Sequence, residues 1–120
     1  MATSFTDILQ RAVERVPGAL GAIFAAWDGE AVDVVAPDHD QLLILAAHYG
    51  IVLNHVQSVL HLFHFGEAHE IILQHERMDL LVHAVGEGYY LLLAVGGAAH
   101  LATALREVAS AATALRAEMY

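Results

Sequence analysis

Apolar residues in a long central segment of the chain recur with the spacing of an α-helix. When residues 41–65 are placed on an α-helix, with a rotation of 100° per residue, two series of positions fall on two different sides of the helix. We expect the first side to pack on the chain's own sheet and the second to be covered by another copy of the chain. The first stripe comprises Leu42, Leu45, Tyr49, Val52, Leu53, Val56, Val59, Leu60 and Phe63, and the second comprises Ile44, His48, Ile51, His55, Ser58 and Leu62.

The segments around this helix carry the patterns of two further helices and five strands. Helical spacing from Phe5 to Val16 stops at Pro17-Gly18, and a last helix follows Gly96-Gly97. Two strand-like runs, 19–27 and 31–36, meet at the hairpin signal Asp28-Gly29. Three more strands are expected at 69–75, 78–85 and 89–95. The predicted order is α-β-β-α-β-β-β-α, an α/β (α+β) fold with a five-stranded antiparallel sheet and helices on both faces.

Composition narrows the class of protein. A length of 120 residues predicts one domain, 1–120, and 58% apolar content exceeds the globular norm of roughly 45–50%, which fits an additional buried interface. The net charge of −9, without any lysine, repels nucleic acid and anionic lipid, so we expect a protein partner. Polar residues interrupt every apolar run before the ~20 residues that a bilayer requires, so no membrane insertion is expected. The absence of cysteine and of a signal-peptide pattern favours the cytoplasm.

The residues offer no arrangement typical of catalysis or of a cofactor site. Ser4, Ser58 and Ser110 fall in helical contexts without a nucleophile motif, and cysteine is absent. The Gly86-Glu87-Gly88 segment lies between two strands, whereas a phosphate-binding loop joins a strand to a helix. We therefore expect a protein that is not an enzyme and that holds no cofactor.

Nine histidines raise the question of a metal. His48 and His55 share one side of the helix, and a two-fold axis could bring four of their nitrogens together from two copies. Zinc sites use shorter spacings with further ligands, so we interpret these histidines as small polar residues in an apolar seam, without metal. An alternative is a pH-responsive dimer, because protonation of buried imidazoles near pH 6 would weaken association.

Several features resemble the roadblock/dynein light chain family, including its bacterial Mgl-type members. They are Leu20-Gly21-Ala22-Ile23 before Asp28-Gly29, the long helix, and the run from Glu70 through Tyr89-Tyr90 to Leu93. The resemblance implies a homodimer in which the central helices lie antiparallel and the following strand, with Ile72, pairs with its twin. It also implies a scaffold or regulator of a small Ras-like GTPase that supplies no catalytic side chain.

A polar side remains on the central helix. On the family's arrangement it faces outward and is doubled by the two-fold axis, and its uncharged mixture of polar and apolar groups suits a protein-binding platform. An ordinary solvated helix side is the alternative. The platform residues are Leu43, Asn54, Gln57, His61 and His64.

A second function stays open, because profilin-like sheets share this topology in part. A small-molecule sensor of that fold predicts a closed pocket inside the sheet near Trp27 or Tyr89. A pH-responsive or metal-responsive sensor would instead use the histidines described above.

Overall fold

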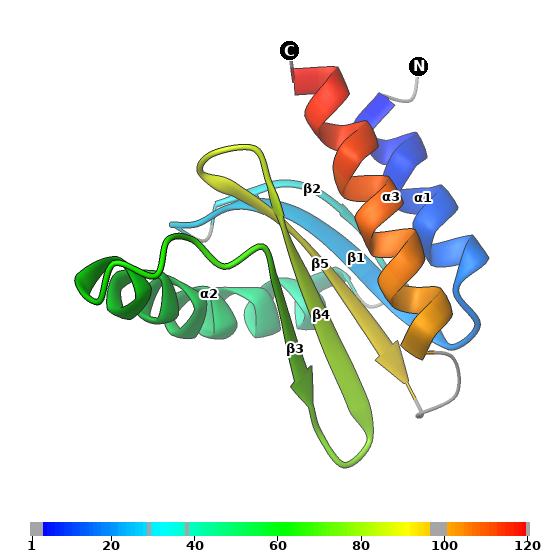
Figure 1. Cartoon of the computed structure of the whole chain (residues 1–120). Helices are drawn as coiled ribbons and strands as arrows, with labels where there is room; N and C mark the ends of the chain where they lie inside the picture. Colours follow the sequence, from blue (N-terminus) through cyan, green and yellow to red (C-terminus); the bar gives the residue numbers. More distant parts are fainter. Residues whose placement is uncertain (1–3, 29, 38, 97–100, 120) are drawn as a thin grey trace.

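A computed structural model describes residues 4–28, 30–37, 39–96 and 101–119 (Figure 1). Its element order is the predicted one, and the strand bounds differ from the predicted ones by at most one residue at either end. The elements are α1 (Ser4–Arg15), β1 (Ala19–Ala26), β2 (Ala31–Val35), α2 (His39–Leu62), β3 (Glu70–Gln74), β4 (Met78–Val85), β5 (Tyr89–Gly96) and α3 (Leu101–Met119).

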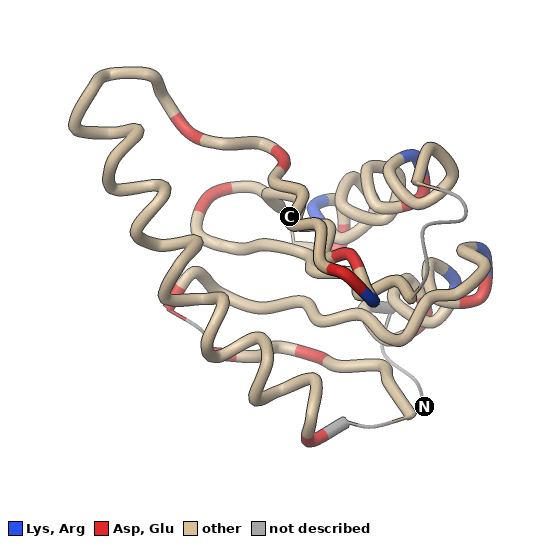
Figure 2. Tube along the Cα trace, turned by 90° about the horizontal axis from the view of Figure 1, so that it is seen from below, with Lys and Arg blue, Asp and Glu red and all other residues tan. Residues whose placement is uncertain are grey.

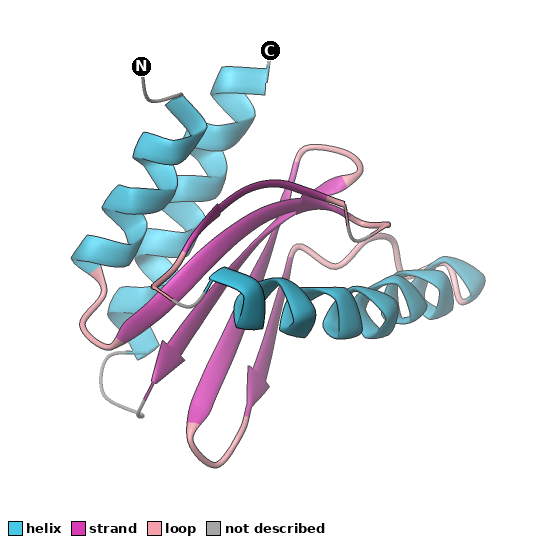
Figure 3. Ribbon diagram, turned by 180° about the vertical axis from the view of Figure 1, so that it is seen from behind, coloured by secondary structure: helices cyan, strands magenta, loops and turns pink. Residues whose placement is uncertain are grey.

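The five strands form one sheet in the order β2-β1-β5-β4-β3, with every neighbouring pair antiparallel. Helices α1 and α3 cover one face and α2 crosses the other (Figure 3). The predicted five-stranded antiparallel sheet with helices on both faces is confirmed. Strands β2 and β3 are the two edges of the sheet.

The central strand β5 is apolar throughout because both of its faces are covered. Leu91 and Leu93 pack toward α1 and α3, whereas Tyr90 and Leu92 pack toward α2. All four side chains are fully buried. The sheet therefore separates two apolar cores, and each helix layer closes one of them.

Strand β3 shows the same alternation at the edge of the sheet. Ile71 and Leu73 pack in the core on the α2 side. Ile72 lies on the opposite face and is 39% exposed. The structure thus places Ile72, which we predicted in the dimer interface, on the other face of the sheet from the second stripe of α2.

The central helix ends earlier than predicted, at Leu62 and not at Phe65. His64 adopts a positive φ of 59°, its amide donates to the carbonyl of His61, and the amide of Phe65 donates to the carbonyl of Leu60. These two hydrogen bonds form a Schellman motif, which closes a helix with a left-handed residue. The apolar spacing continues through this turn, which is why periodicity alone extended the helix. His64 is therefore part of the turn and not of the helical platform.

The first stripe of α2 is also less covered than predicted. Leu42 and Leu53 are buried on the sheet, but Val52, Val59 and Phe63 are 46%, 41% and 60% exposed. The expectation that the sheet covers the whole stripe was wrong for these three residues. The last turns of α2 project past the sheet (Figure 1), which leaves Val59 and Phe63 bare, whereas Val52 lies at the flank of the helix, beside the buried Leu53.

Gly21 provides a test of the packing between β1 and the end of β2. A Cβ there would lie 2.7 Å from Cβ of Ala36 and 2.9 Å from the carbonyl oxygen of Val35, whereas a Cβ on Gly96 would meet nothing closer than 3.5 Å. We expect Gly21→Ala to lower the free energy of unfolding by about 1–3 kcal/mol because the backbone must shift. The matched Gly96→Ala should change it by less than about 0.5 kcal/mol. Urea unfolding compares the two variants, and equal midpoints would contradict this packing.

Candidate protein-binding site on the central helix

Most of the large hydrophobic side chains that the structure exposes are gathered on α2 and the turn after it. Exposed apolar area of this extent marks an interaction site in a soluble protein. We call these residues the apolar surface. They are Ile44, Ile51, Val52, Val59, Leu62, Phe63 and Phe65, with exposures between 41% and 76%.

The second stripe lies on the side of α2 that faces away from the sheet, and all six of its residues are exposed. Two of its polar groups are bound within the helix. Nδ1 of His48 donates to the carbonyl of Ile44 at 2.9 Å, and Oγ of Ser58 donates to the carbonyl of Asn54 at 3.0 Å. Because these donors are already satisfied, covering this side with another protein surface would cost less desolvation free energy.

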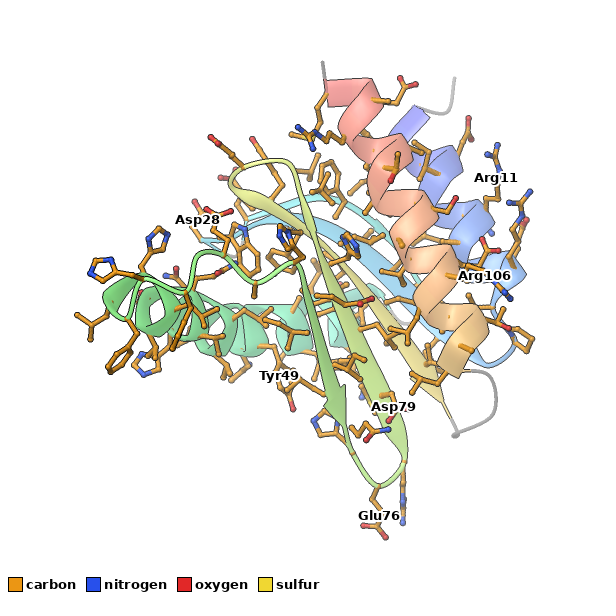
Figure 4. All side chains as sticks on the ribbon, viewed as in Figure 1. Arg11, Asp28, Tyr49, Glu76, Asp79 and Arg106 are labelled. Carbon is orange, nitrogen blue, oxygen red and sulfur yellow. The ribbon has the colours of Figure 1, made fainter. Side chains whose placement is uncertain are left out.

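The apolar surface continues around α2 toward strand β3. Tyr49 reaches from α2 to the end of β3 (Figure 4), where its hydroxyl is hydrogen-bonded to Nε2 of His75. Helical spacing places Val52, Val59 and Phe63 close to the same side as Tyr49. The side of α2 that carries these exposed side chains therefore meets the open edge of the sheet at Tyr49.

Fixed charge is absent from this part of the chain. After Asp40, α2 and the following turn through Gly66 contain no Asp, Glu, Lys or Arg, and α2 is uncharged in Figure 2 beyond its first turn. Arginines lie mainly on the other side of the sheet, on α1 and α3, at positions 11, 15, 106 and 116. A surface without fixed charge fits the desolvated centre of a protein interface.

The structure places the residues of the predicted platform in separate locations. Asn54, Gln57 and His61 line one cleft of about 460 Å³ at the C-terminal half of α2. Leu43 lies near the start of the helix and packs against the core, and His64 lies in the closing turn. Sequence reasoning missed the other side of this cleft, which Trp27 and Glu67 provide, because no spacing pattern links these residues to the helix.

Gln57 has a structural role within this cleft. Its Oε1 accepts the Ala68 amide at 3.1 Å, and its Nε2 donates to the Ala68 carbonyl at 3.5 Å. The side chain thereby holds the segment between α2 and β3 against the helix. A helix residue that was predicted to face a partner thus also shapes the cleft.

No protein-family model matches the chain, and no curated protein matches it in sequence. Solved structures do match. A Roadblock/LC7 domain from Streptomyces avermitilis has a TM-score of 0.84 at 23% identity, over 93% of this chain and 94% of that one. Myxococcus xanthus MglB has a TM-score of 0.88 at 13% identity, over 98% and 95%. The gliding protein MglB from Thermus thermophilus has a TM-score of 0.85 at 23% identity, over 95% and 87%.

This chain has the Roadblock/LC7 fold. The resemblance seen in the sequence is confirmed at the level of the fold, over nearly the whole chain. These solved structures share the fold of this chain, including α2 and the edge strand β3. Because their sequence identity to this chain is low, its partners must be inferred from its own surface.

Among the residues that the structure describes, the cleft beside Trp27 differs from the closed pocket that a small-molecule sensor predicts near Trp27 or Tyr89. The Tyr89 ring packs 5.6 Å from the ring of Phe24, and the cleft beside Trp27 is open to solvent. An apolar pocket of about 360 Å³ lies instead near the start of α2 and includes Leu20, Leu42 and Met78. Sequence reasoning did not anticipate this pocket.

Metal ligands are not assembled within the described part of a single chain. Over the residues that the structure describes, no three His, Asp or Glu side chains come together as a metal site would require. The four-nitrogen arrangement of His48 and His55 needs a second copy, so it stays a hypothesis about the dimer.

Helix α2 is long enough and apolar enough to cross a bilayer. We had expected its polar residues to interrupt the apolar run before that length. The most apolar 18-residue window of Asp40–Leu62 has a mean hydropathy of 1.4, and 22% of this window is buried. The buried residues Leu42, Ala46 and Leu53 pack it on the sheet. Its high hydropathy thus reflects one side that is covered by the sheet and another that is bare.

Tyr90 forms a buried support beneath the cleft. Its ring lies 4.9 Å from the ring of Trp27, and its hydroxyl has no hydrogen-bond partner among the described residues. Burial, with a smaller contribution from the carboxylate of Asp28, raises the pKa of Tyr90. The Tyr90 hydroxyl therefore loses its proton at a higher pH in the folded protein than in the unfolded chain, where tyrosine has a pKa of about 10.

We expect Tyr90→Phe to raise the free energy of unfolding by up to about 1 kcal/mol at pH 7, because it removes a buried hydroxyl without a partner. Stability of the parent protein should decline as the pH rises above about 10, and this variant should flatten the decline. Urea unfolding at pH 7 and above pH 10 measures both effects, with Tyr89→Phe as the control. A large loss of stability in Tyr90→Phe would show that the hydroxyl is bonded.

Proposed function

We propose that this roadblock-fold chain forms a cytoplasmic homodimer that binds and regulates a small Ras-like GTPase without contributing a catalytic residue. The observation that carries the proposal is the apolar surface of α2 beside the open edge of β3. A chain with this surface bare needs a partner, and the resemblance to Mgl-type proteins implies both a second copy and a GTPase.

The second copy fits the geometry of the edge. Strand β3 ends the sheet, so its outer amides and carbonyls can pair with a twin strand. Antiparallel pairing would join two five-stranded sheets and bring the two α2 helices side by side. Complete burial of a Val, Leu, Ile or Phe side chain contributes about 1.5–3 kcal/mol. Even partial burial of the apolar surface in both copies contributes a free energy comparable to the cost of association, which is about 4–15 kcal/mol.

Two valines of equal exposure test this interface. Val52 on α2 and Val32 on β2 are each 46% exposed. We expect Val52→Asp to convert the dimer to a monomer, because the charge would be buried against the twin helix. Val32→Asp, at the opposite edge of the sheet, should leave the dimer intact. Size exclusion with light scattering gives the mass, and a dimer that survives Val52→Asp would contradict the arrangement.

The GTPase would bind the outward side of the paired helices. Asn54, Gln57 and His61 lie beside the seam, and a two-fold axis would present them twice. These side chains are uncharged at neutral pH and mixed with apolar neighbours, which suits a protein-binding surface. Regulation would then act through rearrangement of the partner's own loops, as the Mgl-type resemblance implies.

The combined substitution Gln57→Glu with His61→Glu tests this platform. The two carboxylates should abolish capture of a small Ras-like GTPase, because they introduce charge into a neutral contact surface. Gln57→Glu keeps the oxygen that accepts the Ala68 amide but loses the Nε2 that donates to the Ala68 carbonyl. Circular dichroism and light scattering therefore check that the fold and the dimer persist in the variant. The paired control is Gln10→Glu with Ser110→Glu, on α1 and α3. Affinity capture of the GTPase in both nucleotide states is the measurement, and retained capture would refute the platform.

A further inference from the structure

The cleft at the C-terminal half of α2 has a chemistry of its own. It lies where the end of β1 and the start of β5 approach α2 and the segment before β3. Its volume is about 460 Å³, and it is lined by Trp27, Asn54, Gln57, Ser58, His61, Glu67 and Gly88. Figure 4 shows the neighbouring Asp28 at this end of the sheet, above α2.

Three of the polar side chains that line the cleft have defined hydrogen-bonding roles. Both ends of the Gln57 amide are occupied by the Ala68 backbone. The Ser58 hydroxyl donates its hydrogen to the Asn54 carbonyl, which leaves its oxygen to accept. The Glu67 carboxylate can only accept when it is ionised. A ligand that pairs with Glu67 must therefore bring a donor.

The fixed charge of the cleft is negative. Glu67 is the one lining residue with a fixed charge, and the exposed Asp28 follows Trp27 directly. Glu67 also borders a second cleft that contains Arg116, but the ion pair seen in the described part of the chain is Arg15 with Glu107. The Glu67 carboxylate is thus left to attract a cation from outside, in a protein whose net charge is −9.

An aromatic ring completes the arrangement. The Trp27 ring packs on the ring of Tyr90 at 4.9 Å, and the Trp27 amide donates to the Gly88 carbonyl at 3.0 Å. The indole is therefore held in place on one side while it lines the cleft on another. A cation over an indole is attracted by the ring's quadrupole. A planar guanidinium can stack on the ring and direct its donors to a carboxylate at the same time, which an ammonium cannot do as well.

We propose that this cleft binds an arginine side chain presented by a protein partner, with the guanidinium between Trp27 and Glu67. Ser58 and Asn54 supply further acceptors along its edge. The inference names the chemistry that the site recognises and needs no assumption about the partner's identity. Where the partner is the GTPase of the proposed function, this arginine would be an anchor of that complex.

The protein contains a single tryptophan, so its fluorescence reports on this cleft directly. The probe is the tripeptide acetyl-Gly-Arg-Gly-amide, compared with the same peptide containing citrulline, which has the shape of arginine without its charge. We expect a saturable change of Trp27 emission with the arginine peptide, with a Kd on the order of millimolar. The citrulline peptide should bind at least about fivefold more weakly, since it lacks the charge that pairs with Glu67.

Two carboxylate variants form the matched pair. Glu67→Gln should weaken binding of the arginine peptide about fivefold, because it removes the paired charge. Glu76→Gln removes an exposed carboxylate at the β3–β4 turn, away from the cleft (Figure 4), and should leave the affinity unchanged. Equal binding of the two peptides, equal affinity of the two variants, or no saturable change would overturn the inference.

The peptide titration also separates this inference from the proposed function. If the arginine peptide fails to bind while the GTPase is still captured, the cleft assignment is wrong and the platform stands. If the peptide binds as expected and the GTPase is not captured, the cleft assignment stands and serves a different arginine-bearing protein.

Discussion

Helix α2 is attached to the sheet by a narrow strip of its surface. Leu42, Ala46 and Leu53 are buried there, and Tyr49 adds a hydrogen bond to His75 at the end of β3. Much of the rest of the helix is left to solvent or to another protein. The arrangement follows from the length of the helix, whose last turns project beyond the sheet that could cover them. The same excess length supplies both the proposed dimer seam and one wall of the cleft.

The two faces of the sheet differ in their chemistry. The α1 and α3 layer carries most of the arginines and the Arg15–Glu107 ion pair, as expected for a surface that stays in water. The α2 layer has no fixed charge after Asp40, and its polar groups partly bond to its own backbone. A surface of this kind is stable only when it is covered, because bare apolar area is the costly state in water. The distribution of charge and the exposed hydrophobic residues therefore both indicate that the α2 face is the one covered by a partner.

The turn after α2 connects the apolar surface to the cleft. The Schellman motif at His64 reverses the chain, and Gln57 then holds Ala68 against the helix. Glu67 is brought to the cleft by this short return segment, and Trp27 reaches the same cleft from the end of β1. Backbone hydrogen bonds at one helix end thus decide where the carboxylate of the proposed arginine site lies.

The sequence by itself determined the element order, the strand positions and the bare second side of α2. These features depend on local periodicity and on turn residues such as Pro17, which act over a few positions along the chain. Only the tertiary structure decided how narrow a strip of α2 the sheet covers, and hence that Val52 is exposed beside the buried Leu53. It alone brought Trp27 and Glu67 together, since residues far apart along the chain meet through the path of the backbone and leave no spacing pattern to read.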